Sequence, residues 1–235
     1  MKILGLIPAR GGSKGIPRKN LYPVLNKPLI AYTIEPALRS CLLSHVVVST
    51  DDRDIAEESK KRGAQIPFIR PIGFAQDQSS ALEVVTHAID FYRHINVEFD
   101  LIVYLQPTSP LRSVEAIDGS IAKMCEYDAD SLVSVMDVPH QFSVDSQMIE
   151  EGNYVHPVGG DIGRLRRQEK THYVARNGPA ILITSPATVE NYQSLYGERT
   201  LSYKMSRMES MDIDGLEDIW YVEQALLRKD RPLSN

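Results

Sequence analysis

The feature that most constrains the fold of this chain is a regular alternation between short apolar, β-branched runs and amphipathic helical patterns. Two of the runs, Val46-Val47-Val48 and Leu101-Ile102-Val103, are apolar at every position, as strands covered on both faces are. This alternation is typical of a parallel sheet with crossover helices. We therefore expect an α/β fold with strands at 3–8, 45–50, 65–69, 101–105, 131–135 and 180–184, and helices at 29–40, 55–62, 81–96, 114–126 and 216–227.

Residues 139–176 break this pattern. They are polar, rich in glycine and histidine, and only weakly periodic. A free loop of this length is uncommon within a compact domain. We therefore expect one domain over residues 1–235, with 139–176 as a hairpin-like excursion that packs on another surface, such as a second subunit.

A basic, glycine-rich segment follows the first predicted strand. It reads Ala9-Arg10-Gly11-Gly12-Ser13-Lys14-Gly15-Ile16-Pro17-Arg18-Lys19-Asn20, in a chain whose net charge is -5. Glycines let backbone N–H groups approach an anion and turn toward it, and the basic side chains add positive charge. The segment matches neither G-x-x-x-x-G-K-[ST] nor G-x-G-x-x-G, so ATPase and dehydrogenase functions lose their main support. We interpret it as a polyphosphate-binding loop; the alternative is a surface loop kept soluble by its charges.

Cationic side chains of this loop are the candidates for holding a nucleotide triphosphate. Arg10, Lys14 and Lys19 would also offset the charge that develops on a leaving pyrophosphate. The Ser13 hydroxyl suits phosphate oxygens, and the Asn20 amide suits ribose or phosphate. A solvated loop lysine is the alternative for Lys19. The nucleotide-binding residues predicted in this loop are Ala9, Arg10, Gly11, Gly12, Ser13, Lys14, Lys19 and Asn20.

Two aspartates, Asp212 and Asp214, are candidate metal ligands. Their spacing of two places both carboxylates on one face of an extended segment. Such a pair suits Mg²⁺ (or Mn²⁺), because Mg²⁺ binds one or two carboxylates together with substrate phosphates. Asp214 followed by Glu217 also fits a helix start, so a purely capping role for Asp214 is the alternative.

A polar turn, Gln106-Pro107-Thr108-Ser109-Pro110-Leu111-Arg112, follows the predicted strand at 101–105. In a parallel sheet this turn emerges at the same edge as the basic loop. Gln106, Thr108 and Ser109 present uncharged hydrogen-bonding groups that suit sugar hydroxyls and amides. The alternative is a proline-rich turn in which these hydroxyls only cap local structure.

Four segments together resemble the motifs of the acylneuraminate cytidylyltransferases, the CMP-sialic acid or CMP-nonulosonic acid synthetases. They occur in the family's order along nearly the whole chain, at 7–20, 106–112, Arg166-Arg167-Gln168 and Met211-Asp212-Ile213-Asp214. The resemblance implies a Rossmann-like, three-layer α/β fold of nucleotidyltransferase type with a mostly parallel sheet. It also implies a homodimer joined through the protruding segment 139–176.

The resemblance further implies roles for individual nucleotide-binding residues. Lys19 is expected near the α-phosphate of CTP, and Lys19, Arg10 and Asp214 are the expected catalytic residues. The aspartate pair is expected beside the nucleotide phosphates. Arg70 and Ser80, which follow the third predicted strand, are expected at the cytidine base and ribose.

On the sugar side, the resemblance places Gln106 at the acyl sugar. A second basic cluster, within the excursion, is expected to supply arginines for the sugar carboxylate. The planar guanidinium binds a carboxylate at two points. A solvated run of charges is the alternative for this cluster, which contains Arg164, Arg166, Arg167 and Arg176.

These patterns predict a cytidylyltransferase that joins CMP from CTP to an acidic nine-carbon keto sugar and releases pyrophosphate. N-acetylneuraminate and legionaminate are the expected sugar types. Pseudaminic acid, 3-deoxy-octulosonate, another nucleoside triphosphate, and a nucleotide-binding regulator without turnover remain alternatives. The acidic balance argues against a nucleic-acid partner, and no apolar run is long enough to span a membrane. Two cysteines fit a reducing cytoplasm, where we expect the enzyme to reside.

Overall fold

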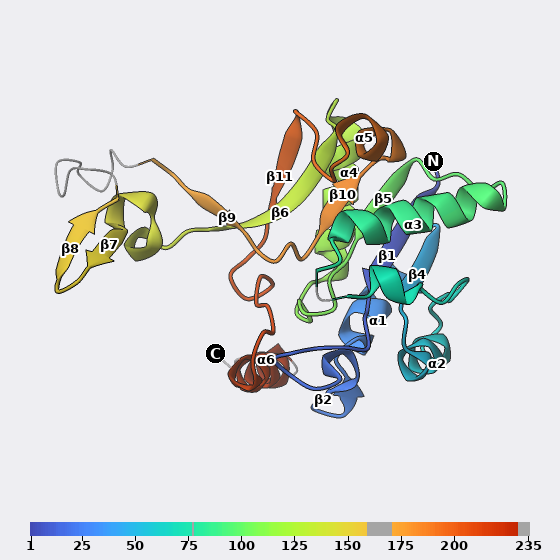
Figure 1. The fold of residues 1–235 in the computed structure, drawn as a ribbon, viewed down its shortest axis with the longest axis horizontal. Coiled ribbons are helices and arrows are strands. Elements are labelled where there is room, and N and C mark those ends of the chain that lie inside the picture. Colours follow the sequence, from blue (N-terminus) through green and yellow to red (C-terminus); the bar gives the residue numbers. More distant parts are fainter. Residues whose placement is uncertain (77, 159–170, 230–235) are drawn as a thin grey trace.

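The computed structural model describes residues 1–76, 78–158 and 171–229. Its centre is a mixed sheet with the strand order β11-β6-β10-β5-β1-β4, and β9 pairs with β6 off this path (Figure 1). β4 and β5 flank β1 in parallel and β11 is parallel to β6, whereas β10 is antiparallel to both neighbours. The prediction of a mostly parallel α/β sheet is thus confirmed. The strands of this sheet are β1 (Ile3–Pro8), β4 (His45–Ser49), β5 (Leu101–Tyr104), β6 (Ser131–Asp137), β9 (Val174–Arg176), β10 (Leu182–Thr184) and β11 (Thr200–Lys204).

Helices cover both faces of the sheet because each strand sends alternate side chains to opposite sides. In β1, Ile3 and Ile7 join a core with α1, α2 and α4, whereas Leu4 and Leu6 join a core with α3 and α5. No helix among the described residues is long and apolar enough to cross a membrane. The helices are α1 (Ala31–Arg39), α2 (Arg53–Lys61), α3 (Ala81–His94), α4 (Val114–Glu126), α5 (Pro186–Tyr192) and α6 (Leu216–Lys229).

A third, smaller core joins the C-terminal helix α6 to the basic loop. It contains Ile16 of the loop, Ile213 between the two candidate metal ligands, and Val222 of α6, all fully buried. Apolar side chains therefore hold together two segments that lie about 200 positions apart in the sequence. This packing brings the predicted phosphate-binding and metal-binding segments to one place.

The prediction of a strand at 65–69 is wrong. Only Gln65 forms a bridge, to Val47, and the chain then leaves the sheet. Pro67 has no N–H to donate to a ladder, so pairing cannot continue through it. Phe68 instead packs against the α3 side of the core, and the chain continues to Arg70 at the cavity described below.

The edge strand β11 and the short helix α5 are among the elements that were not expected from the sequence. The edge strand β11 alternates half-buried Leu201 and Tyr203 with exposed neighbours, so it lacks the continuous apolar run of the central strands. The short helix α5 starts at Pro186, after an N-cap in which the Ser185 hydroxyl accepts a hydrogen bond from the Thr188 backbone N–H. Both lie in the second half of the chain, where apolar runs are sparse.

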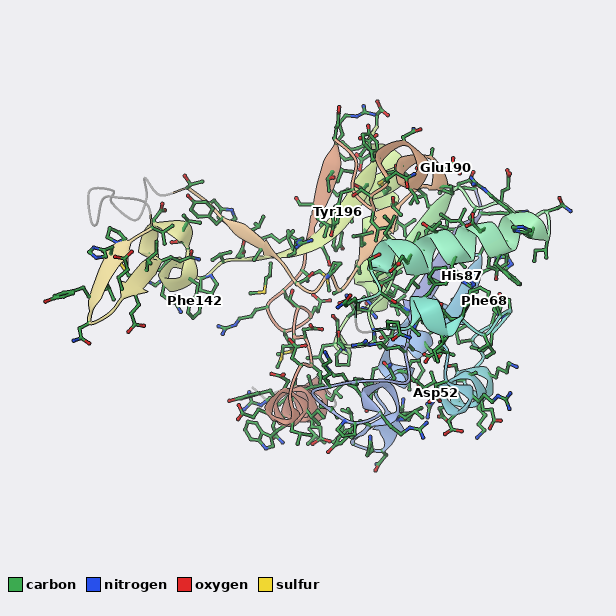
Figure 2. All side chains as sticks on the ribbon, viewed as in Figure 1. Asp52, Phe68, His87, Phe142, Glu190 and Tyr196 are labelled. Atoms are coloured by element: carbon green, nitrogen blue, oxygen red, sulfur yellow. The ribbon has the colours of Figure 1, made fainter. Side chains whose placement is uncertain are left out.

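The described parts of 139–176 contain a hairpin that leaves and rejoins the sheet. The chain leaves β6, forms the hairpin of β7 (Met148–Glu151) and β8 (Tyr154–Pro157), and returns as β9 along β6. Figure 1 shows this hairpin projecting well beyond the rest of the molecule. The arm, by which we mean β7, β8 and the short turns at 140–146 before them, carries exposed apolar side chains, including Phe142 and Tyr154. Figure 2 labels Phe142 on this arm.

Candidate active site

A polar cavity of about 400 Å³ opens beyond the carboxyl ends of β1 and β5. This is the edge at which open α/β sheets bind ligands. The loop after β1, the turn after β5, the segment before α3 and the segment before α6 all contribute to it. The predicted site residues that line it are Arg10, Gly12, Ser13, Lys19, Asn20, Arg70, Ser80, Gln106, Thr108, Asp212 and Asp214.

Two hydrogen bonds fix the start of the basic loop, one to a residue that follows β4 and one from an asparagine within the loop. The Gly11 backbone N–H donates to the Asp51 carboxylate at 3.0 Å, and the Asn20 side-chain amide donates to the Arg10 carbonyl at 2.9 Å. A Cβ on Gly11 would lie 2.8 Å from an Asp52 carboxylate oxygen, so only glycine fits without displacement. Figure 2 labels Asp52 at the start of α2. This carboxylate caps the helix by accepting a hydrogen bond from the Ile55 N–H.

Lys19 connects the basic loop to the segment that carries the two aspartates. Its ammonium donates to the Ile213 carbonyl at 2.6 Å and the Asp214 carbonyl at 3.3 Å, and lies 3.8 Å from the Asp214 carboxylate. The Lys19 side chain is only 14% exposed, which argues against a freely solvated lysine. Its charge is therefore held at the cavity wall.

Asp212 lies at the junction of this segment with the turn after β5. The Ile213 backbone N–H donates to the Thr108 carbonyl at 2.8 Å, and the Ser109 hydroxyl lies 3.4 Å from the Asp212 carboxylate. Burial raises the pKa of Asp212, hydrogen bonding from Thr108 opposes this, and the nearby Asp214 charge raises it further. Burial and the neighbouring negative charge thus disfavour the ionised form of Asp212, which a cation bound beside it would stabilise.

The donor set around Asp212 and Asp214 fits Mg²⁺. Magnesium prefers oxygen ligands and uses one or two carboxylates, with substrate phosphates completing its coordination. Within the described residues no group of three or more His, Cys, Asp or Glu side chains gathers to hold a metal. The protein therefore offers a partial site, in which phosphate oxygens and water would supply the remaining ligands.

The capping alternative for Asp214 is not what the structure shows. The Asp218 carboxylate accepts hydrogen bonds from the backbone N–H groups of Asp214 at 2.9 Å and Gly215 at 2.8 Å. The Asp214 side chain itself is 91% exposed at the mouth of the cavity. The helix start is thus stabilised by Asp218, and the Asp214 carboxylate is available for another role.

A different wall of the cavity is built around Arg70. This residue is 4% exposed, its backbone N–H donates to the Thr50 carbonyl, and its guanidinium lies 3.9 Å from Asp51. Its Nε has no hydrogen-bond partner among the described residues, and burial lowers the pKa of the group. A buried donor without a partner at a cavity wall is a group ready for a ligand. Ser80 lines the same wall while it also caps α3.

Sequence reasoning missed several residues of this wall. Tyr104, whose pKa is raised by burial to about 12, ends β5 and faces the cavity, and Phe74 and Gln76 reach it from the segment before α3. Gly178, with a φ of 120°, also lines the cavity and lies next to Gln106. A polar or aromatic residue at the carboxyl end of a central strand was the one available signal, and it applies to Tyr104.

Some predicted residues lie outside the cavity lining. Ala9 and Ser109 are buried behind it, and Gly11 and Lys14 belong to the loop without lining it. Arg176 lies on β9, where its guanidinium donates to the Tyr196 hydroxyl at 3.1 Å and stacks over that ring, which Figure 2 labels. The roles predicted for Arg164, Arg166 and Arg167 concern positions outside the described residues.

The similarity to known proteins extends over nearly the whole chain. The pattern of the cytidylyltransferase family matches residues 4–159. The chain is 34% identical to the CMP-N,N'-diacetyllegionaminic acid synthase of Legionella pneumophila over 97% of both proteins. It is 31% identical to the pseudaminic acid cytidylyltransferase of Campylobacter jejuni over 95% of both. It is also 33% identical to the N-acylneuraminate cytidylyltransferase of Streptococcus agalactiae, over 94% of this chain and 52% of that relative.

Solved structures show the same fold. The CMP:2-keto-3-deoxy-manno-octonic acid synthetase, complexed with CTP, superposes with a TM-score of 0.72 over 97% of this chain and 100% of that one, at 18% identity. The sequence resemblance carried by four motifs is therefore confirmed. The chain belongs to the cytidylyltransferase family and is a nucleotidyltransferase.

Proposed function

We propose that this protein activates a nonulosonic acid by transferring CMP from CTP, giving the CMP-sugar and pyrophosphate. The observation that carries this proposal is that three kinds of functional group line one cavity. Basic residues of the loop after β1, two carboxylates before α6 and an uncharged polar turn after β5 line it together. The names of the relatives, which activate legionaminic, pseudaminic and N-acylneuraminic acids, support the same class of acceptor. A regulator without turnover would have no need for this combination.

In the proposed reaction the anomeric hydroxyl of the sugar attacks the α-phosphorus of CTP. The new oxygen–phosphorus bond forms as the bond to the bridging oxygen of pyrophosphate breaks, and the hydroxyl proton leaves to water. Such phosphoryl-type transfers depend mainly on positioning and charge stabilisation. Lys19 and Arg10, which both line the cavity, supply positive charge to the transferring and leaving phosphates.

We propose that Asp212 and Asp214 hold the divalent cation, Mg²⁺ or Mn²⁺. When bound, the cation neutralises phosphate charge and polarises the phosphorus toward attack. The protein's own part is to keep both carboxylates at the cavity. Ser109 and Thr108 orient Asp212, while the Asp218 cap leaves the Asp214 side chain free to turn inward.

The two ends of the cavity suit the two substrates. Arg70 and Ser80, with their neighbours before α3, form the side proposed for the cytidine base and ribose. Gln106 and Thr108 form the side proposed for the acyl sugar. The sugar carboxylate is assigned to the second basic cluster, of which Arg176 lies within the described residues.

We further propose that the protein is a homodimer joined through the arm that carries β7 and β8. Exposed apolar side chains on this arm support the proposal, among them Phe142, Ile149 and Tyr154. Surfaces of this kind mark interaction sites in soluble proteins. Light scattering after size exclusion should give twice the chain mass, and Phe142→Asp combined with Ile149→Asp should shift the protein toward the monomer.

A pyrophosphate-release assay tests the enzymatic proposal. Separate reactions contain CTP, Mg²⁺ and one of four acids: N-acetylneuraminic, legionaminic, pseudaminic or 3-deoxy-octulosonic acid. Controls omit the sugar, replace Mg²⁺ by EDTA, or replace CTP by another nucleoside triphosphate. We expect turnover with legionaminic or N-acetylneuraminic acid. Turnover with pseudaminic acid alone would favour the specificity of the 31% identical relative. Tight CTP binding without pyrophosphate in any reaction would refute the enzymatic proposal.

A further inference from the structure

A buried arginine lies directly behind the sugar side of the cavity. Arg112 ends the turn after β5, is 2% exposed, and does not line the cavity itself. Its hydrogen-bond partners among the described residues are neutral: two backbone carbonyls and one hydroxyl. Its Nε has no partner among them, and burial lowers the pKa of the group to about 9. The fold thus keeps a charged group in its interior without a carboxylate bonded to it.

Core filling does not explain this residue. Removing a guanidinium from water is unfavourable, and apolar side chains of similar volume often replace buried charges with equal or greater stability. An arginine differs from such residues in its planar fork, which places several donors in fixed directions. The role of Arg112 should therefore be sought in the groups that the fork connects.

The fork connects three separate elements. Nη1 donates to the Gln106 carbonyl at 3.1 Å and to the Ala180 carbonyl at 2.7 Å. Nη2 donates to the same Gln106 carbonyl at 3.2 Å and to the Thr33 hydroxyl, on α1, at 2.8 Å. One rigid group thus fixes the backbone at the start of the turn after β5 relative to the backbone that enters β10.

Both of these backbones carry the sugar side of the cavity. Gln106 and Gly178, which is two residues before Ala180, both line it. The two are in close approach, since a Cβ on Gly178 would lie 3.1 Å from the Gln106 side-chain oxygen. The Gln106 side chain therefore lies close against the Gly178 backbone, and Arg112 bonds the chain on both sides of this approach.

We propose that Arg112 is a positioning residue for the acceptor sugar. By bonding the carbonyls of Gln106 and Ala180, it holds the backbone of Gln106 against the segment that enters β10 and so fixes the position from which the Gln106 side chain meets the sugar. This inference rests on the proposed function. It adds to the residues that line the cavity a buried residue, Arg112, that acts through them. It predicts an effect on the use of the sugar and not on the binding of CTP.

The test compares Arg112→Met with Arg112→Lys and with a control arginine. Methionine keeps much of the volume but has no donors, and lysine keeps the charge without the fork. Arg62→Met is the control, because Arg62 also anchors its surroundings, through Glu58 and Glu35, but follows the end of α2 and does not line the cavity. For each variant, kcat/KM for the sugar is measured at saturating CTP, the Kd of CTP by calorimetry without sugar, and Tm by circular dichroism.

We expect kcat/KM for the sugar to fall about 100-fold in Arg112→Met, since a misplacement of about 1 Å has effects of this size. Arg112→Lys should recover only part of this loss. The Kd of CTP should stay within about twofold, because a uniform structural weakening would change both substrates. A folded Arg112→Met with an unchanged kcat/KM for the sugar, or with equal losses for sugar and CTP, would overturn the proposal.

A milder pair of variants keeps the test decisive if Arg112→Met fails to fold. Thr33→Val removes the hydroxyl that accepts from Nη2 at nearly constant volume, and Thr33→Ser keeps it. Loss of one hydrogen bond predicts about a fivefold fall in kcat/KM for the sugar in Thr33→Val, and little change in Thr33→Ser. Equal behaviour of the two variants would contradict the proposal.

The failure of this inference is distinguishable from failure of the proposed function. The wild-type protein must first release pyrophosphate with one of the four sugars. If it does not, the proposed function fails and the Arg112 variants are not informative about a sugar site. If it does, selective loss of sugar use in the variants supports the positioning role, and its absence refutes that role alone.

Discussion

Replacing Gly15 by alanine should separate the basic loop from the aspartate segment. A Cβ on Gly15 would lie 2.5 Å from the Asp214 carbonyl oxygen, whereas ordinary contacts start at 3.4 Å. The neighbour is backbone, which cannot turn aside as a side chain does. The two segments must therefore move apart by 0.9 Å, the difference between these distances. The same interface contains the bond from Lys19 to the Ile213 carbonyl at 2.6 Å, which would lengthen toward 3.5 Å.

The expected consequence is a loss of rate with little loss of folding. A misplacement of about 1 Å between groups that act on one reacting centre lowers rates by about 100-fold. We therefore expect kcat in Gly15→Ala to fall by about this factor, and the Mg²⁺ concentration for half-maximal activity to rise. The buried contact of Ile16 with Ile213 should keep the two segments associated, so the change in Tm should be small.

The assay is steady-state pyrophosphate release with CTP and the preferred sugar across a Mg²⁺ titration. Gly73→Ala is the matched control, because a Cβ there meets no atom within 4 Å. It should retain wild-type kcat and Mg²⁺ dependence. Wild-type kcat and Mg²⁺ dependence in a folded Gly15→Ala would refute the view that the loop and the aspartate segment must stay in register.

Three further predictions concern single side chains. Asp214→Ala should lower kcat by about 100-fold if its carboxylate holds the cation. Asp218→Ala should keep kcat and lower the free energy of unfolding by about 1 kcal/mol, because it removes the acceptor for the Asp214 and Gly215 N–H groups. Equal effects of the two substitutions in kinetics and in urea unfolding would contradict this division of roles. Lys19→Met should lower kcat by 10²–10³-fold with folding retained, and unchanged kcat and KM for CTP would remove Lys19 from the mechanism. Burial lowers the pKa of His87 below its ordinary 6.5, so the unfolded chain binds more protons than the folded chain near that pH, and the free energy of unfolding should fall as the pH drops below 6.5. The difference between the urea midpoints at about pH 5 and about pH 7.5 should therefore be smaller in His87→Gln than in the wild type. An equal difference would refute this role of His87.

The sheet was largely predictable because its signal is local. The central strands β1, β4 and β5 are continuous apolar runs, since both of their faces are covered. The edge strand β11 faces solvent on one side and carries only Leu201 and Tyr203 inward, so its pattern is short and weak. The antiparallel direction of β10 has no local signal either, because direction depends on how the chain crosses between strands.

The candidate site was predictable where strand ends determine it. The loop after β1 and the turn after β5 meet at one edge because parallel strands align their carboxyl ends, which brings Lys19 and Gln106 to one cavity. By contrast, the absence of a hydrogen-bond partner for the Arg70 Nε among the described residues could not be predicted, because elements distant in sequence bury this group. The capping of α6 by Asp218 instead of Asp214 depends on which of several nearby carboxylates turns inward, and spacing alone does not decide this.

The most direct test of the central claim is ³¹P NMR of the wild-type protein with CTP, Mg²⁺ and legionaminic or N-acetylneuraminic acid. The account predicts that the three CTP phosphorus signals disappear together, while the phosphodiester signal of the CMP-sugar and the pyrophosphate signal grow in a 1:2 intensity ratio, because pyrophosphate carries two equivalent phosphorus atoms. CDP with orthophosphate, free CMP with pyrophosphate, or unchanged CTP from a folded protein that binds CTP would contradict transfer of CMP to the sugar at this cavity.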